Sequence, residues 1–279
     1  MSSCDTSSNT SEEFVLSVIL PVRNDAPSVN VMVRILTVMV DVPCEIIVVY
    51  DDPTDTAVPV LEQLKPRHPQ LRGLLNGRGG VLNAVRAGVA AARGHYILIY
   101  AADEIGPVLA IGRMLELMMA GCDFVSGTRY RGGGRRYGGS LLGHALSLTA
   151  NTLFRIMSAT ALSDCTTGIK MFRRELFEDF RLSSAGSGWS FAFEMAIRAQ
   201  LMGLKLGEVP VVSIDRLFGG RSTFRPIPWI VSYSRWFFWG IRNLPPWHRP
   251  RPRLAIRAER YPYEERKAAS NCLHGLVRQ

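Results

Sequence analysis

The amino-acid sequence predicts an α/β fold in which helices flank a mostly parallel sheet. Two observations carry this prediction: short apolar runs of strand length recur from residue 17 onward, and segments with helical spacing separate them. Such alternation gives right-handed crossovers and an open parallel sheet. Ligands bind these sheets beyond the carboxyl ends of the strands, and polar residues follow each predicted strand here.

Each predicted element follows from its own pattern. Apolar runs bounded by polar residues predict strands at 17–22, 45–50, 95–100 and 123–127. Apolar residues at helical spacing predict helices at 29–40, 57–65, 82–93, 108–120 and 141–157. Gly94 follows the third of these helices, where glycine commonly ends a helix. The glycine-rich segment 77–80 lies before that helix, and no strong strand is predicted ahead of it.

The composition favours a folded protein with anionic partners. Its 279 residues carry a formal net charge of +9, and 47 % of them are hydrophobic. A basic surface attracts nucleotides, phosphates, lipid headgroups or nucleic acid, although it can also be merely solvated. We expect no nucleic-acid partner among these. The five cysteines form no CxxC pair and have no zinc-ligand spacing, which favours a reducing compartment.

The N-terminal segment differs from the rest of the chain. Residues 1–13 are rich in Ser, Thr and Asn, and we expect a disordered tail without the features of a signal peptide. Later apolar stretches are interrupted by charged or polar residues before they reach the roughly 20 residues that span a bilayer. We therefore expect a cytoplasmic protein that is peripheral, at the cytoplasmic face of a membrane.

A contact with that membrane is expected near the C-terminus. Residues 226–245 are dense in Trp and Phe and flanked by Arg, a composition typical of amphipathic helices at the bilayer interface. The basic, flexible tail expected at 246–279 would attract anionic lipid. The alternative is a helix that packs its aromatic face on the core.

Carboxylates follow several of the predicted strands. At the shared edge of a parallel sheet they could meet the demands of a nucleotide diphosphate sugar. Asp25 and Asp51 could accept hydrogen bonds from the base and ribose. Asp103, beside Glu104, could hold a divalent cation on the diphosphate, because Mg²⁺ prefers carboxylate oxygens. An acidic pair after a strand is also a common turn sequence.

Other nucleotide-binding motifs are missing. No G-x-G-x-x-G turn follows the first strand, and no G-K-[ST] sequence occurs, which excludes a nicotinamide site and a P-loop of the usual kind. Glycines at 132–134 and 138–139 bracket Arg135 and Arg136. That basic segment is either a loop that closes over an anion or a plain connection to the next helix.

Ordered sequence blocks carry a resemblance to a known family. The blocks are SVILPVRND, EIIVVYDDPTD, NGRGG to GHYILIYAADE, VSGTRY, DCTTGIKMFRRE, and FAFEMAIRAQLMGLKLGEVP with DRLFGGRSTF. In this order they resemble family 2 glycosyltransferases, in particular the dolichyl- or polyprenyl-phosphate sugar transferases. The resemblance covers residues 15 to 245 and implies a GT-A (Rossmann-like) domain over 14–225. It also implies an inverting, metal-assisted hexosyltransferase that uses Mg²⁺ or Mn²⁺.

The resemblance implies roles for individual residues. Donor-binding residues are Pro21, Arg23, Asp25, Asp51, Arg78, Ala102, Asp103 and Arg129. Acceptor-binding residues are Asp164, Thr167, Lys170, Arg216 and Ser222, with Gly168 and Gly219 in the same blocks. The metal is expected at Asp103 and Glu104, and the catalytic residues are Asp103, Asp164 and Arg216.

The sequence departs from the family pattern in the metal motif, where Ala101 replaces the first Asp of D-x-D. Tyr50 to Pro53 replaces the usual D-D-G-S, and one extra residue in the last block lets Gly220 take the place of Gly219. Two alternatives stay open: a family 2 enzyme with a glycan or small-molecule acceptor, and a non-catalytic nucleotide-sugar-binding homologue. The retained acceptor-side block argues against the second of these.

Overall fold

A computed structural model gives the fold, and its described residues are 14–138, 141–184, 188–214, 226–247 and 254–257. The strands in these ranges are β1 (Leu16–Val22), β2 (Cys44–Tyr50), β3 (Leu71–Leu75), β4 (Tyr96–Ile99), β5 (Phe124–Thr128), β6 (Arg135–Tyr137), β7 (Lys170–Arg173), β8 (Leu206–Pro210), β9 (Val212–Ile214) and β10 (Leu254–Arg257). The α-helices are α1 (Ala26–Met39), α2 (Ala57–Leu64), α3 (Val81–Ala91), α4 (Ile111–Met119), α5 (Leu141–Met157), α6 (Ser190–Leu201) and α7 (Pro226–Asn243).

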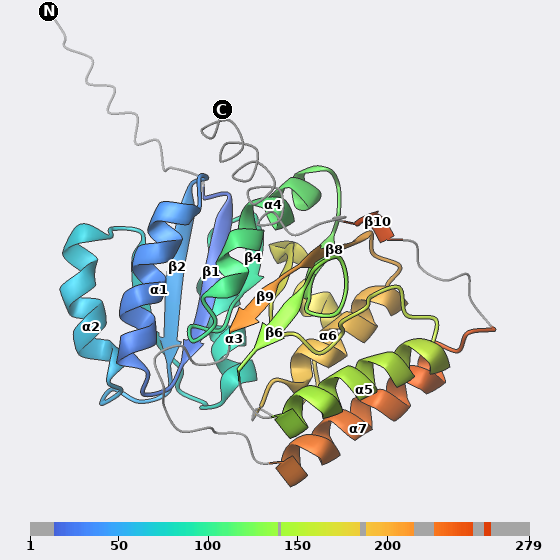
Figure 1. The fold of residues 1–279 in the computed structure, drawn as a ribbon. Coiled ribbons are helices and arrows are strands. Elements are labelled where there is room, and N and C mark those ends of the chain that lie inside the picture. Colours follow the sequence, from blue (N-terminus) through green and yellow to red (C-terminus); the bar gives the residue numbers. More distant parts are fainter. Residues whose placement is uncertain (1–13, 139–140, 185–187, 215–225, 248–253, 258–279) are drawn as a thin grey trace, which may run out of the picture.

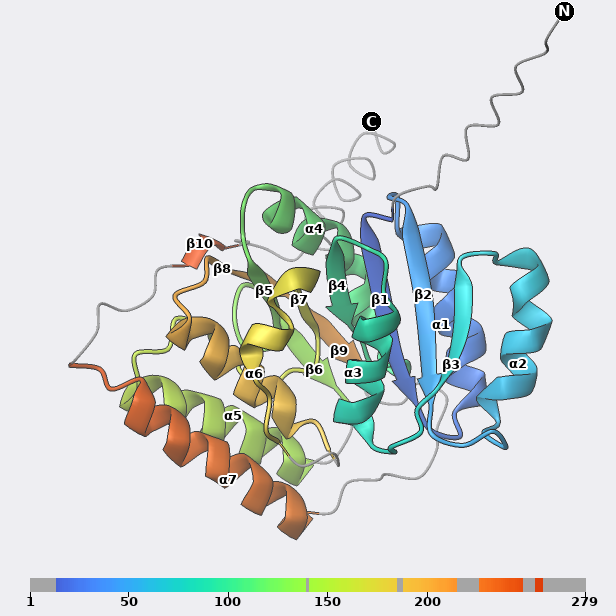
Figure 2. The same cartoon turned by 180° about the vertical axis from the view of Figure 1, so that it is seen from behind.

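A central sheet of eight strands separates two layers of helices in the described part of the chain (Figure 1). Its order is β10-β8-β5-β7-β4-β1-β2-β3, and only β7 runs antiparallel to its neighbours, β4 and β5. Helices α1, α2 and α4 cover one face, and α3 and α6 cover the other, which Figure 2 shows from behind. The prediction of an α/β fold with a mostly parallel sheet is confirmed.

The central strands are apolar on both sides because helices cover both faces of the sheet. In β1, Val18 and Leu20 belong to the core beneath α1, whereas Ile19 belongs to the core beneath α3. In β2, Val48 and Val49 divide in the same way. Strands buried on both faces have continuous apolar sequences, and this made the ranges of β1, β2, β4 and β5 predictable.

Two local predictions were wrong. A strand, β3, does precede the glycine-rich segment 77–80, and it pairs with β2 at the edge of the sheet. Gly94 does not end α3, because that helix ends at Ala91 and Ala92 already has an extended backbone. Glycine is needed at 94 for a close approach: a Cβ there would lie 2.6 Å from the backbone carbon of Leu16.

The C-terminal part of the described chain adds a helix and an edge strand. Helix α7 lies within the predicted range 226–245 and packs beside α5 and α6 (Figures 1 and 2). Within the predicted tail 246–279, strand β10 pairs with β8. Residues 246 and 247 of this tail are also described, and the remaining residues of the two predicted tails lie outside the described residues. Among the described helices, none combines the length and the apolar composition needed to cross a membrane.

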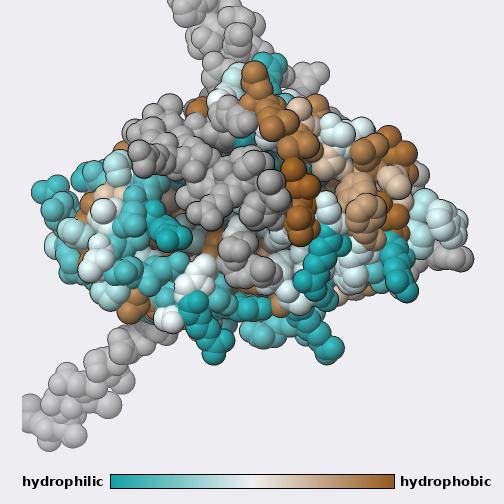
Figure 3. All heavy atoms as spheres, turned by 90° about the horizontal axis from the view of Figure 1, so that it is seen from below, coloured by the Kyte–Doolittle hydropathy of each residue, from teal (hydrophilic) through white to brown (hydrophobic). Residues whose placement is uncertain are grey.

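Helices α5 and α7 present an apolar surface on the side of the molecule away from β1 to β3. Apolar residues gather on the half of this face that the two helices form (Figure 3). We call this the α5–α7 surface; its exposed residues are Leu141, Leu142, Leu146, Leu148, Leu153, Ile156, Met157, Ile230, Val231 and Phe238. The opposite side of α7 packs inward through Trp236, which is 3 % exposed, and Gly240, which lies against the ring of Phe154.

Candidate functional site

A pocket of about 360 Å³ lies beyond the carboxyl ends of β1 and β2, where the fold predicts ligand binding. Its walls come from the segments that follow β1 and β2 and from the glycine-rich turn before α3. The lining residues are Arg23, Asn24, Asp51, Asp52, Asp55, Gly79 and Gly80. Three carboxylates and one guanidinium therefore surround a space that accepts polar ligands with both donor and acceptor groups.

The carboxylate of Asp51 is fixed in this pocket by two hydrogen bonds. Asn76 donates its side-chain amide to Oδ1 at 2.7 Å, and the backbone N–H of Gly80 donates to Oδ2 at 2.9 Å. Gly79 and Gly80 have φ of +64° and +83°, a conformation that glycine adopts without strain. The turn thus aims a backbone N–H at Asp51, while the neighbouring Arg78 is exposed at the pocket's edge.

The segment after β1 is shaped by two further aspartates. Asp25 accepts a hydrogen bond from the backbone N–H of Ser28 and caps α1, so it does not line the pocket. Asp55 does line it, and its carboxylate accepts the backbone N–H of Asn24 at 2.8 Å. Asn24 has a φ of +52°, and this bond holds it there. Pro21 lies inside β1, two residues before Arg23, the first residue that lines the pocket.

The predicted metal residues follow β4. Tyr100 is buried and donates its hydroxyl to the backbone oxygen of Glu104 at 2.6 Å, which shapes the turn. The side chain of Glu104 accepts a hydrogen bond from Ser213 of β9, and Ala102 is buried. No group of three His, Cys, Asp or Glu side chains that could hold a metal ion occurs among the described residues.

The residues after β4 therefore fit a cation only in part. Asp103 is half-buried at the end of the strand, and Ala101 supplies no second carboxylate. Mg²⁺ is commonly bound by one or two protein carboxylates, with substrate phosphates and water completing its shell. A cation held by Asp103 fits this pattern once a diphosphate is present.

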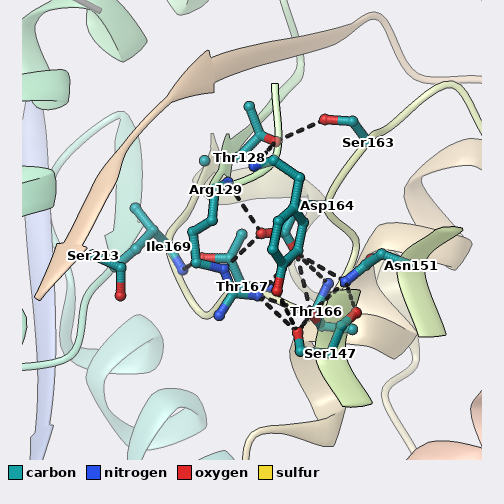
Figure 4. A network of polar contacts seen from close by, with 12 residues as sticks. Thr128, Arg129, Ser147, Asn151, Ser163, Asp164, Thr166, Thr167, Ile169 and Ser213 are labelled. Carbon is teal, nitrogen blue, oxygen red and sulfur yellow. Dashed lines mark hydrogen bonds and ion pairs between the residues drawn. The ribbon is translucent and has the colours of Figure 1, made fainter. Parts of the chain in front are cut away.

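A buried ion pair forms the other side of the site, beyond β5. Arg129 and Asp164 are joined by a two-pronged contact, with Nε to Oδ2 at 2.7 Å and Nη2 to Oδ1 at 3.0 Å. Asp164 also accepts the backbone N–H groups of Arg129, Thr166 and Thr167 (Figure 4). Its carboxylate is completely buried, with 0 % of the side chain exposed.

Electrostatics keep this pair charged. Burial alone would raise the pKa of Asp164, but the charge of Arg129 and the hydrogen bonds to the carboxylate bring that pKa below its usual value. Burial likewise opposes the charge of Arg129, and Asp164 more than offsets it, so the pKa of Arg129 is raised. Asp164 is therefore an ionised partner for Arg129, and all its oxygens are engaged.

The predicted acceptor block divides between this network and the sheet beneath it. Thr167 is buried in the loop and accepts the backbone N–H of Ile169. Lys170 starts β7 with no exposed surface, and it donates to the hydroxyl of Ser126 at 2.7 Å. Burial lowers the pKa of Lys170 to about 8. Its position is thus under the loop that carries Asp164. Arg216, Gly219, Gly220 and Ser222 lie outside the described residues.

Sequence reasoning missed several residues that the structure brings to the site. Asn76 and Asp55 hold the turns around the pocket that contains Asp51. Ser147 and Asn151 of α5 contact the ion pair, together with Thr166 (Figure 4). A signal for the α5 residues existed: Ser147 and Asn151 are small polar residues four positions apart, and such residues lie on one helix face. Asn76 could have been noticed because it directly follows a strand.

Comparison with curated proteins finds relatives that handle sugars. The chain is 31 % identical over 157 residues to polyprenol monophosphomannose synthase of Mycolicibacterium smegmatis, covering 54 % of this chain and 57 % of that protein. It is 27 % identical over 211 residues to glycosyltransferase AglD of Haloferax volcanii, covering 70 % of this chain and 32 % of that protein. The chain thus spans 57 % and 32 % of the lengths of these two relatives.

Solved structures share the fold. Glucosyl-3-phosphoglycerate synthase from Mycobacterium tuberculosis, in complex with Mn²⁺, UDP and glucosyl-3-phosphoglycerate, aligns with a TM-score of 0.59 at 19 % identity, covering 82 % of this chain and 78 % of that one. A second complex of that enzyme, with Mn²⁺, UDP-glucose and phosphoglyceric acid, gives 0.58 at 18 % identity and the same coverage. The predicted GT-A fold is confirmed by this likeness.

The family follows from the sequence itself. Residues 17–181 match the model of glycosyl transferase family 2. This range begins in β1 and ends just before the loop leading to α6, so it contains the pocket around Asp51, Asp103 and the Arg129–Asp164 pair. It covers more than half of the 279 residues, and the chain belongs to glycosyl transferase family 2.

Proposed function

We propose that this chain is a hexosyltransferase that moves a sugar from a nucleoside diphosphate sugar to a polyprenyl phosphate. The observation that carries the proposal is the pairing, at one edge of the sheet, of a polar donor pocket with a buried, ionised Arg129–Asp164 pair. The pocket around Asp51 suits a nucleotide, and the guanidinium of Arg129 suits a phosphate. The names of two relatives, a polyprenol monophosphomannose synthase and a glycosyltransferase, support the same reaction class.

The chemistry needs little from a general base. A phosphate monoester is already anionic near neutral pH, so it can attack the anomeric carbon directly and invert it. The chain's task is then to align the two substrates and to neutralise charge on the leaving diphosphate. Asp164 fits no proton-accepting role, because Arg129, Thr166 and Thr167 occupy both of its oxygens. By the family resemblance, Arg216 adds a second positive charge.

A divalent cation, Mg²⁺ or Mn²⁺, belongs to this proposal. Asp103 would hold it, with Glu104 supporting the turn from its contact with Ser213. When bound, the cation supplies positive charge to the diphosphate as the sugar leaves. The Mn²⁺ present in structures of the glucosyl-3-phosphoglycerate synthase supports this assignment. With a single carboxylate on the protein side, phosphate oxygens of the nucleotide and water would supply the remaining ligands.

A panel of donors and acceptors tests the proposed reaction. Full-length protein is incubated with radiolabelled UDP- and GDP-sugars and either polyprenyl phosphate or phosphoglyceric acid, with Mg²⁺, Mn²⁺ or EDTA. We expect label in the lipid phase for one donor, and only when polyprenyl phosphate is present. Transfer to phosphoglyceric acid alone would reassign the enzyme to a small-molecule acceptor. Nucleotide binding without transfer to any acceptor would identify a non-catalytic binder.

The acceptor also calls for a membrane contact, which we place on the α5–α7 surface at the cytoplasmic face. Leu142 and Phe238, on different helices, are 59 % and 68 % exposed. Large side chains exposed on adjacent helices suit insertion among lipid headgroups. The free thiols of Cys44, Cys122 and Cys165 agree with a reducing compartment. The sequence placed this contact on 226–245 and the basic tail; α5 enlarges it.

Substitution of two outward residues tests the membrane contact. Leu142→Ser with Phe238→Ser should lower binding to phosphatidylcholine–phosphatidylglycerol vesicles at least about tenfold, since burying each side chain is worth roughly 1.5–3 kcal/mol. Co-sedimentation measures the partitioning. Val38→Ser with Met119→Ser is the control, because both residues are exposed on α1 and α4 instead. Equal binding of all three proteins would remove the membrane contact from this surface.

A further inference from the structure

The guanidinium of Arg129 is immobilised on two of its three nitrogens. Nε contacts Asp164, and Nη2 contacts Asp164, the hydroxyl of Thr166 at 2.9 Å and the hydroxyl of Ser147 at 3.4 Å. No hydrogen bond reaches Nη1 from any described residue. No described side-chain nitrogen or oxygen is both fully buried and unpaired, so Nη1 reaches accessible space. The Nη1 group of Arg129 is therefore fixed in position and accessible to a ligand.

Asn151 of α5 holds the loop that carries the carboxylate. Its amide nitrogen donates to the hydroxyl of Thr166 at 2.9 Å and to Oδ1 of Asp164 at 3.4 Å. Its amide oxygen accepts the backbone N–H of Cys165 at 2.9 Å. A single buried side chain therefore contacts three consecutive residues of the loop, and one of them is the partner of Arg129.

Ser147 lies one turn earlier on the same face of α5 and completes the set of side chains around Arg129 and Asp164. Tyr130 donates its hydroxyl to Ser147 at 2.8 Å, and Thr166 donates its own hydroxyl to Asp164 at 3.0 Å. The hydroxyls of Ser147 and Thr166 lie 3.1 Å apart and share a hydrogen bond. Tyr130, Ser147 and Thr166 thus form a connected set of hydroxyl groups beside the carboxylate of Asp164.

We propose that Ser147 and Asn151 are positioning residues that orient Arg129, so that Nη1 binds the phosphate of the acceptor, and that Asp164 is the clamp for this guanidinium. The proposal rests on the proposed function in one respect: the anion at Nη1 is a phosphate monoester. A planar guanidinium gains specificity when its orientation is fixed, because the ligand can then reach only the donors that the protein leaves accessible. The positioning residues come from α5, the helix that also forms the α5–α7 surface.

A double-mutant cycle on full-length protein tests this assignment. Asn151→Ala should raise the dissociation constant for farnesyl monophosphate about tenfold, since hydrogen bonds to charged groups have this weight. Arg129→Lys keeps the positive charge but loses the planar guanidinium with its paired donors, and it should weaken farnesyl monophosphate binding at least as much. In the Arg129→Lys background, Asn151→Ala should add less than about twofold, because its effect passes through the guanidinium. Calorimetric titration gives the four constants.

Further variants separate positioning from a general loss of structure. Ser147→Ala should weaken farnesyl monophosphate binding, and Ser147→Thr, which keeps the hydroxyl, should restore most of it. Nucleotide binding should stay unchanged in the Ser147 and Asn151 variants, since neither residue lines the pocket that contains Asp51. Asn30→Ala, on the exposed face of α1, is the matched control. Additive effects of Asn151→Ala and Arg129→Lys, or equal losses of nucleotide binding, would overturn the assignment.

Failure of the proposed reaction can be distinguished from failure of the positioning proposal. If the wild-type protein binds farnesyl monophosphate and inorganic phosphate but transfers no sugar, the proposed reaction is refuted. The double-mutant cycle still tests the positioning proposal. Wild-type protein that binds neither anion would overturn the positioning proposal itself. Binding of farnesyl monophosphate without binding of inorganic phosphate, and with no response to Arg129→Lys, would assign recognition to the lipid chain and also overturn it.

Discussion

Replacing Asp103 by alanine should lower the turnover number by about 10²–10³-fold, the usual effect of losing one electrostatic contact to a developing charge. Asp103 is the one carboxylate that the β4 end offers at the D-x-D position, since Ala101 occupies the other. Its loss should also abolish Mn²⁺ binding in the presence of UDP or GDP, which electron paramagnetic resonance detects independently of turnover. The melting temperature should stay near that of the wild type, because Asp103 is half-buried in a turn.

Asp41→Ala is the matched control for this experiment. Asp41 is exposed in the connection between α1 and β2, away from the strand ends that form the site. Its removal should change neither turnover nor Mn²⁺ binding. Undiminished Mn²⁺ binding in Asp103→Ala would transfer the cation to other residues, and undiminished turnover would separate Asp103 from the chemistry.

Replacing Arg129 by methionine should reduce the free energy of unfolding by about 3–5 kcal/mol, the range found when one member of a buried ion pair is removed. Methionine retains much of the packing volume but removes the main counter-charge of the buried Asp164, which leaves only the weaker influence of Lys170. Urea unfolding at pH 7.5 measures the loss. Arg113→Met is the control, because Arg113 pairs with Glu116 on the surface and such pairs contribute about 0–1 kcal/mol.

The pH dependence of this variant should have the opposite sign to that of the wild type. In the wild type the pKa of Asp164 lies below its unfolded value of about 3.9, so its stabilising effect is present above that pH and is lost as pH falls through the folded pKa. Without Arg129, the largest influence that opposes burial is lost, so the pKa of Asp164 should rise and the folded state should gain protons as pH falls. The stability difference between the two proteins should therefore shrink from pH 7.5 towards pH 4.5. A difference that stays constant would show that charge burial is not its cause.

The parts of the fold that could be predicted are those with an unambiguous local pattern. Strands β1 and β2 were found because cores on both faces demand continuous apolar sequence. Strand β3 has Arg72 and Gly73 in its middle and lies at the edge of the sheet, where a continuous apolar sequence is not required. The reversed direction of β7 is also absent from any local pattern, since direction in a sheet depends on which neighbours are already in place.

The residues of the site likewise divide into those that the sequence could predict and those that it could not. Asp51 and Asp103 were predictable because each follows a strong strand, and the fold class tells where strand ends meet. Asp25 has the same position after β1, yet its local hydrogen bond to the first turn of α1 occupies it. Asn151 could not be assigned a partner from sequence, since its contacts lie 13 to 15 residues away in a loop of irregular structure.

The order of the strands has a consequence for synthesis of the chain. Strands β3, β2, β1 and β4 occupy one side of the sheet and come without interruption from residues 16–99, which also contain every residue lining the donor pocket. A nascent chain can therefore assemble this half first. Until β7 has been translated, the free edge of β4 presents unpaired backbone groups to other chains. The antiparallel strand β7, which joins the two halves, therefore also covers an edge that is prone to aggregation.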